Sequence, residues 1–167
     1  MNSAPRGTET AKEKTCCVAG HRNIPADQTE YVKAELRKKV EQAIIDGYDC
    51  FLTDLMEGTD QLFAEIVSEI CQNNETIRME AIVPYQNRLE KLFAGETSSP
   101  LLMACTETTV TSEKYSPNSY QANRREQLRR SSRMIVVFDG RDKGGTIRAI
   151  RMAHAQQVPI QEIPLKY

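Results

Sequence analysis

Short apolar runs alternate with amphipathic stretches along this chain of 167 residues. The run at 134–138, MIVVF, is rich in β-branched and aromatic residues, which is typical of a strand buried on both faces. The stretches between such runs place apolar residues three or four positions apart, as amphipathic helices do. The pattern predicts strands at 15–19, 49–53, 79–83, 107–111 and 134–138, and a last short strand that begins at 158–160. It also predicts a helix ending near residue 47, further helices at about 59–72, 86–93, 120–132 and 146–157, and a loop at 95–100.

Strands that alternate with helices through short connections are typical of a parallel sheet covered by helices on both faces. We therefore predict a single α/β domain of Rossmann-like architecture. The polar segment 1–14 does not share the pattern, so we predict a disordered leader there and a domain covering residues 15–167.

The overall charge argues against some classes of partner. A net charge of -1 and an isoelectric point near 6.2 indicate no general attraction to polyanions, so nucleic acid is disfavoured as a partner. The absence of a long apolar run argues against a membrane partner and favours a cytoplasmic protein. The five cysteines show no metal-binding or CxxC spacing, so we interpret them as buried reduced thiols and predict no metal site.

In an open parallel sheet, ligands bind beyond the carboxyl ends of the strands, at the point where the strand order reverses. The glycines and charged residues of this chain gather in the loops predicted at those ends. The candidate ligand-binding residues are Gly20, His21, Arg22, Gly58, Thr59, Asp60, Asp139, Gly140, Gly144, Gly145 and Thr146.

The loop Gly144–Thr146 connects a buried strand to a helix, so its backbone N–H groups are suited to bind a phosphate, and Thr146 would add a hydroxyl and cap the helix. His21 and Arg22 offer donors for a phosphate or carboxylate, and Asp60 is placed to accept a ribose hydroxyl. Simpler interpretations stay open, because these loops could be ordinary turns in which Thr59 and Asp60 only stabilise the start of a helix.

Five arginines, at positions 124, 125, 129, 130 and 133, form the one local excess of positive charge. We favour a solvated helix face as their role. The alternative is that Arg124 and Arg133 clamp a phosphate. No serine, cysteine or histidine can be paired with a general base by spacing, so we predict no catalytic residue.

Three motifs occur in a characteristic order: CCVAGHR at 16–22, GTD at 58–60, and SSR at 131–133 followed by FDG at 138–140 and GGT at 144–146. In this order and spacing they resemble the DUF1273/YpsA-like proteins of the SLOG superfamily. The resemblance implies a Rossmann-like domain that binds a nucleotide-derived ligand such as NAD or ADP-ribose. The lonely-guy phosphoribohydrolases of the same superfamily carry PGGxGTxxE, and their glutamate falls at Ala149 here, which argues against hydrolysis of nucleoside monophosphates.

The main hypothesis is therefore a nucleotide-ligand binding protein of sensor or regulatory type. One alternative is a hydrolase that cleaves an N-glycosidic or phosphoester bond with Asp60 or Glu57. Another is a protein-interaction scaffold with a vestigial crevice, which the acidic turn Asp54–Glu57 would favour, since two acids there repel a phosphate. By analogy with related folds, we expect a homodimer.

Overall fold

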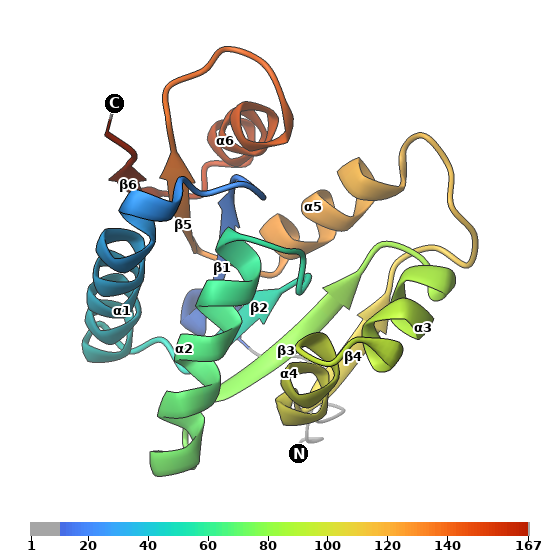
Figure 1. Ribbon diagram of the computed structural model, residues 1–167, viewed down its shortest axis with the longest axis horizontal. Helices are drawn as coiled ribbons and strands as arrows, with labels where there is room; N and C mark the ends of the chain where they lie inside the picture. The colour runs from blue at the N-terminus through green and yellow to red at the C-terminus, as the bar shows by residue number, and fades with distance from the viewer. Residues whose placement is uncertain (1–10, 167) are drawn as a thin grey trace, which may run out of the picture.

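The computed structural model describes residues 11–166 and contains one sheet of six parallel strands with helices on both faces (Figure 1). The strands are β1 (Thr15–Gly20), β2 (Cys50–Thr53), β3 (Arg78–Val83), β4 (Glu107–Val110), β5 (Arg133–Phe138) and β6 (Ile160–Pro164). The helices are α1 (Thr29–Ile45), α2 (Thr59–Asn73), α3 (Gln86–Ala94), α4 (Ser98–Ala104), α5 (Ser119–Arg129) and α6 (Gly145–Ala155). The predicted α/β Rossmann-like fold is confirmed.

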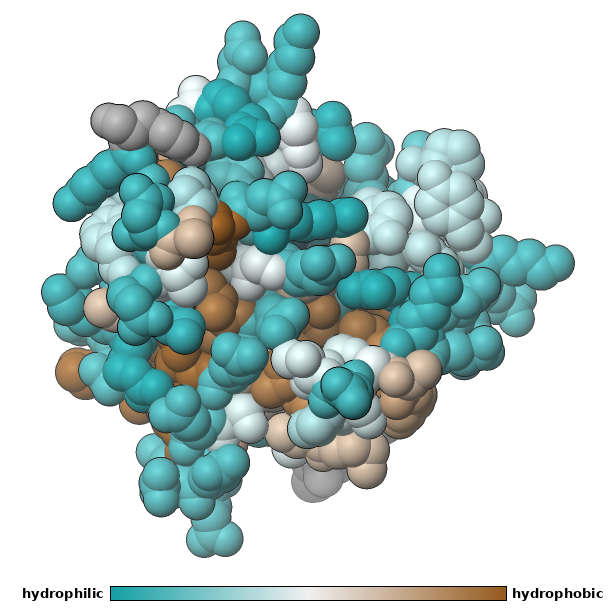
Figure 2. Space-filling model, in the orientation of Figure 1, coloured by the Kyte–Doolittle hydropathy of each residue, from teal (hydrophilic) through white to brown (hydrophobic). Residues whose placement is uncertain are grey.

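The two faces of the sheet bury alternate side chains of the same strands. On one face, Val18 and Phe51 belong to a cluster completed by α1, α2, α3 and α4. On the other face, Leu52 and Val136 pack with Leu128 of α5 and with residues of α6. Figure 2 shows the mostly hydrophilic outer surface, with hydrophobic residues visible in the hollows between the helices. Strands buried on both sides explain why their sequences are continuous apolar runs.

The strand order reverses at β1. The sheet runs β4-β3-β2-β1-β5-β6, so the chain first builds outward from β1 to β4 and then returns to add β5 on the other side. Gly20, at the end of β1, lies opposite Val137 near the end of β5. The loops that follow these two strands therefore begin side by side, which is the geometry of a ligand crevice in open α/β sheets.

One helix was missing from the sequence prediction. Residues 95–100 were expected to form a loop, but α4 begins at Ser98 and buries Leu101 and Leu102 against the core. Pro100 favoured the loop interpretation, yet it sits in the first turn of α4, where its missing N–H has no intrahelical partner to lose. The short length of α4 left too few apolar positions for a helical period to be visible.

The predicted leader lies mostly outside the described residues, and within the described part Lys12–Lys14 form one 3-10 turn ahead of β1. The boundary of the domain at residue 15 stays a prediction. All five cysteines are free thiols, and burial raises the pKa of Cys17 to about 11. In residues 11–166, no helix has the length and apolar character needed to cross a membrane.

Candidate functional site

A cavity of about 540 Å³, here called the crevice, lies at the carboxyl edge of the sheet. This volume falls within the range of small-molecule sites. Four segments line it: the loop after β1 (Gly20, His21, Arg22, Asn23), the turn after β2 (Asp54, Met56, Glu57, Asp60), α5 with the residue Pro117 before it (Tyr120, Gln121, Asn123, Arg124, Gln127), and the segment leading into α6 (Arg141, Gly145, Thr146, Arg148, Ala149, Met152).

The structure brings most of the predicted residues to this one place. Those that line the crevice are Gly20, His21, Arg22, Asp60, Arg124, Gly145 and Thr146. The remaining candidates from the loops are not among its lining residues within the described chain: Gly58, Thr59, Asp139, Gly140 and Gly144. Thr59 and Asp139 do not line the crevice, but both bond to His21, which does.

The first two loops are locked together by a close backbone approach. The Thr59 N–H and hydroxyl both bond to the carbonyl oxygen of His21, at 3.1 and 3.0 Å. Thr59 therefore joins two loops instead of capping α2, whose N-cap residue is Gly58. A Cβ atom at Gly20 would overlap the Thr59 side chain. Gly58 has a φ of +81°, and a Cβ atom there would overlap the Arg22 carbonyl, so both glycines are required by geometry.

His21 connects the loop after β1 to both parts of the β5–α6 segment. Its Nε2 accepts the backbone N–H of Asp139 at 3.1 Å, and its Nδ1 lies 3.3 Å from the Thr146 hydroxyl. Burial lowers the pKa of His21, against the opposing effect of the Asp139 carboxylate. A neutral ring that accepts at Nε2 carries its proton on Nδ1 and donates it to Thr146 Oγ1. The hydroxyl hydrogen of Thr146 is then available to a ligand.

The N-terminus of α6 opens into the crevice without a side-chain cap. Its N-cap residue is Gly144, with a φ of +108°, and in the described part of the chain this helix has no side-chain cap hydrogen bond. Thr146 was predicted to cap this helix, but its hydroxyl is directed to His21 instead. Gly145 and Thr146 line the crevice, so the first N–H groups of α6 and the positive end of its dipole face a ligand there.

The turn after β2 and the first turn of α2 hold two buried carboxyl groups, those of Asp54 and Asp60. Asp60 is 4% exposed, and its Oδ2 accepts the Thr53 hydroxyl at 3.2 Å and the Asp54 N–H at 3.1 Å. Leu55 has a φ of +60°, which costs energy for a residue with a Cβ and marks strained backbone of the kind found at functional sites. Burial and the neighbouring Asp54 carboxylate raise the pKa of Asp60 well above its usual value. This pKa favours the neutral acid at Asp60. The two acids of the turn itself, Asp54 and Glu57, are other residues, and both line the crevice.

Four arginines line the crevice on different sides: Arg22, Arg124, Arg141 and Arg148. Arg124 is fixed by two hydrogen bonds from its Nη1, to the Val18 carbonyl at 2.7 Å and to Gln127 Oε1 at 2.6 Å. Arg141 is held by Asp139, whose Oδ2 lies 2.8 Å from its Nε. Guanidinium groups that are already oriented by the protein are well suited to bind phosphate oxygens.

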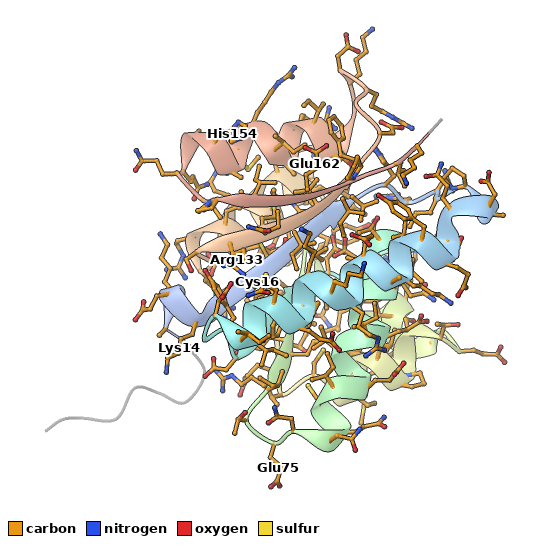
Figure 3. All side chains as sticks on the ribbon, turned by 90° about the vertical axis from the view of Figure 1, so that its left-hand side faces the viewer. Lys14, Cys16, Glu75, Arg133, His154 and Glu162 are labelled. Atoms are coloured by element: carbon orange, nitrogen blue, oxygen red, sulfur yellow. The ribbon has the colours of Figure 1, made fainter. Side chains whose placement is uncertain are left out.

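Arg130 and Arg133 of the predicted cluster serve the fold, whereas Arg125 and Arg129 are exposed on α5. Arg133, proposed as a phosphate clamp, lies at the amino end of β5, on the edge of the sheet opposite the crevice. It pairs with Asp46 at 2.9 Å and stacks on Tyr48, and Figure 3 shows it close to Cys16 of β1. Arg130 is buried and pairs with Glu80 of β3 at 2.5 Å. Arg133 therefore does not reach the crevice, whereas Arg124 lines it, and the role of Arg124 as a phosphate clamp stays a prediction.

Of the face that α5 presents to the crevice, the sequence prediction named only Arg124. The lining residues Tyr120, Asn123, Arg124 and Gln127 follow the i, i+3, i+4, i+7 spacing of one helical face. Asn123 also ties α5 to β3 by donating to the Ile82 carbonyl at 2.8 Å. The spacing was readable in the sequence, but a polar stripe on a helix ordinarily faces solvent, so it gave no reason to expect a site.

Ala149 stands where the lonely-guy enzymes carry their glutamate, and it lines the crevice while being only 2% exposed. A longer side chain at this position would extend into the crevice. Alanine has only a methyl group, so position 149 contributes no carboxylate to the crevice. The last position of the pattern PGGxGTxxE therefore lies in the crevice, and this chain has alanine there in place of glutamate.

Comparisons with known proteins agree with this architecture. The family model for YpsA, described as the YspA SLOG family, matches residues 17–165. The chain therefore belongs to the YpsA-like SLOG family. No curated protein matches it in sequence.

A solved structure shares the fold. It is DNA processing protein A from Helicobacter pylori, described for its single-stranded DNA binding mode. The TM-score is 0.66 and the identity 15%, and the match covers 93% of this chain and 67% of that one. The expectation that nucleic acid is disfavoured as a partner is contradicted by this neighbour. The expectation rested on net charge, which says nothing of charges gathered in one crevice.

Proposed function

We propose that this member of the YpsA-like SLOG family binds the phosphate of a nucleotide-derived ligand in the crevice and acts as a sensor or regulator. The observation that carries the proposal is the open N-terminus of α6, which has no side-chain cap and begins at the crevice wall with Gly145 and Thr146. Free N–H groups at a helix N-terminus form an anion site wherever they meet a cavity.

The donors around this helix end favour phosphate over a smaller anion. The Thr146 hydroxyl supplies a donor when His21 carries its proton on Nδ1, the tautomer in which Nε2 accepts the Asp139 N–H. Arg148 follows on the same helix, one turn from Gly145, and Arg22 approaches from the loop after β1. Donors from several directions match the several oxygens of a phosphate group, and a diphosphate would engage more of them.

The remainder of the crevice is suited to the sugar of such a ligand. Asp54 and Asp60 line its floor and can accept hydroxyl groups of a ribose, as acidic residues do in nucleotide sites. The volume of about 540 Å³ leaves space beyond one phosphate and one sugar. NAD and ADP-ribose are the ligands we expect first. Binding without turnover is the simplest mode, since Ala149 replaces the acid of the hydrolase relatives.

A thermal-shift titration with NAD, ADP-ribose, AMP and a cyclic nucleotide tests the proposal. A ligand that binds only the folded state at a hundredfold excess over its dissociation constant stabilises it by about 2.7 kcal/mol. Arg148→Ala should weaken binding roughly 10- to 100-fold, the loss expected for a charged hydrogen bond. Arg151→Ala is the matched control, because Arg151 is exposed on the same helix and does not line the crevice within the described chain. Equal binding by the two variants, or no shift with any nucleotide, would reject the site.

Single-stranded nucleic acid is a second candidate, favoured by the fold shared with a protein that binds single-stranded DNA. It would use the same four arginines. A labelled oligothymidylate should then bind with an affinity that falls steeply with salt, and each lost phosphate contact should reduce the slope of log K against log[salt] by about 0.7. A response to free nucleotides but not to the oligonucleotide would eliminate this candidate.

A further inference from the structure

Three tyrosines gather at one end of the crevice. Tyr85, which follows β3, packs edge to face against Tyr115 and Tyr120, with ring centroids 5.4 and 6.0 Å apart. The hydroxyl groups of Tyr85 and Tyr120 are 3.2 Å apart and hydrogen-bonded. Half of the six tyrosines of this chain are in this cluster. We call these three residues the tyrosine cluster.

The tyrosine cluster is not a part of the hydrophobic core. None of its members belongs to either core cluster among the described residues, and Tyr115 is 61% exposed. A tyrosine ring that stays in water contributes less to the stability of the fold than a ring buried in the core. Packing against the sheet therefore does not account for the position of the three tyrosines.

Tyr120 connects the cluster to the crevice. It lines the crevice from α5, and the Arg22 guanidinium carbon lies over its ring at 5.8 Å from the centroid. This distance is near the outer limit of a cation–π contact, and Arg22 is exposed, so the arginine is only weakly held there. A planar group can enter on this side of the Tyr120 ring with only a small movement of Arg22.

We propose that the tyrosine cluster is the nucleobase end of the site, where the base of the ligand stacks on Tyr120 with Arg22 on its other face. The inference rests on the proposed function, because the phosphate at α6 is what brings the base to the cluster. The edge contacts of Tyr85 and the hydroxyl bond hold Tyr120 in place, so little conformational entropy is lost when a base binds. Stacking tolerates any base, because every base has a π-face. The structure therefore assigns a ligand that carries an unpaired base, with little discrimination among bases.

Calorimetric titration of AMP, UMP and ribose 5-phosphate tests this assignment, since ribose 5-phosphate has the phosphate and sugar without the base. The wild-type protein should bind both nucleotides roughly 5- to 150-fold more tightly than ribose 5-phosphate, the range expected for one stacked base. Tyr120→Leu should lose this preference and retain its affinity for ribose 5-phosphate. Tyr120→Phe, which keeps the ring, should keep the preference, and it controls for disturbance of the fold.

The outcomes separate the two proposals. Equal affinity of wild-type protein for AMP and ribose 5-phosphate overturns the base assignment and leaves the phosphate site standing. A preference that survives in Tyr120→Leu overturns it as well. If neither compound binds, the phosphate site itself is wrong and the base assignment fails with it.

Discussion

The Nδ1 atom of His21 lies 3.3 Å from the Thr146 hydroxyl, across a separation of 125 positions in the chain. This contact joins the loop after β1 to the start of α6 at the point where the strand order reverses. It orients the Thr146 hydroxyl and, through Nε2, fixes the backbone of Asp139 at the end of β5. A protonated His21 could not accept the Asp139 N–H, so this contact requires the neutral ring. The effect of protonating His21 can be measured.

Acid should destabilise the protein through His21. Burial lowers the pKa of His21 below its usual value of 6.5, so the unfolded state binds a proton more readily than the folded state. The stability that the neutral ring contributes is fully present above pH 6.5 and is lost as the pH falls toward the lowered pKa. The free energy of unfolding, measured with urea between pH 8 and pH 5.5, should fall more for the wild type than for His21→Asn. A difference between the two proteins that does not change with pH would contradict this.

Asp60 should have the opposite pH dependence. Its pKa is raised by burial and by Asp54, so the folded state holds the proton more tightly, and stability is lost as the pH rises from about 3.8 through the raised pKa. Asp60→Asn removes this loss, and its amide oxygen can still accept the Thr53 hydroxyl. We expect the melting temperature of the variant to exceed that of the wild type by a margin that grows from pH 5 to pH 8. A margin that shrinks with pH would show that Asp60 is charged in the folded protein.

The sequence predicted these loops but not their roles. Its apolar runs specified the strands, and parallel order then required the loops containing Gly20, Asp60 and Gly145 to share one edge. Which side chains face the ligand depends on contacts between loops far apart in the chain, such as Thr59 with His21. Propensity and spacing contain no information on such contacts, so Thr59 and Thr146 were both expected to cap helices that begin instead at glycines.

Gly20 should not tolerate a side chain. A Cβ there would overlap Thr59, which is fully buried and bonded to the His21 carbonyl, so Thr59 has no space to move into. Gly20→Ala should lower the free energy of unfolding by about 1–3 kcal/mol, as overpacking does in cores. Gly145→Ala is the control, because no atom lies within 4 Å of its added Cβ, and its stability should match the wild type. Urea denaturation measures both, and equal stability of the two variants would contradict the predicted overlap.

Arg130 should be required for stability and not for binding. It pairs with Glu80 at 2.5 Å in the core, where Arg78 contacts the other carboxylate oxygen at 3.1 Å. Arg130→Met leaves a buried carboxylate without one of its partners and should cost about 3 kcal/mol or more. Arg125→Met, at an exposed position of α5, the helix that ends just before Arg130, should change stability by less than about 0.5 kcal/mol. A loss below about 1 kcal/mol in Arg130→Met would show that the ion pair contributes little.

The buried pair of Arg130 and Glu80 also shows why the arginine cluster was misread. Five arginines close together suggest a charged surface, and the sequence cannot show that Glu80, inside an apolar strand, pairs with the arginine that follows α5. Arg133 is similarly used by Asp46 and Tyr48 at the far edge of the sheet. Only Arg124 faces the crevice, because its position on α5 falls in the stripe shared with Tyr120 and Gln127.

The most direct test of the phosphate site is a titration of ¹⁵N-labelled protein with AMP, followed by the backbone amide resonances. The account predicts that the largest shifts occur at Gly145 and Thr146, where the first N–H groups of α6 meet the phosphate, with a further change at His21. It also predicts that these shifts are absent in Arg148→Ala at the same AMP concentration and present in Arg151→Ala. Amide shifts confined to residues outside the crevice, or none at millimolar AMP, would contradict the central claim.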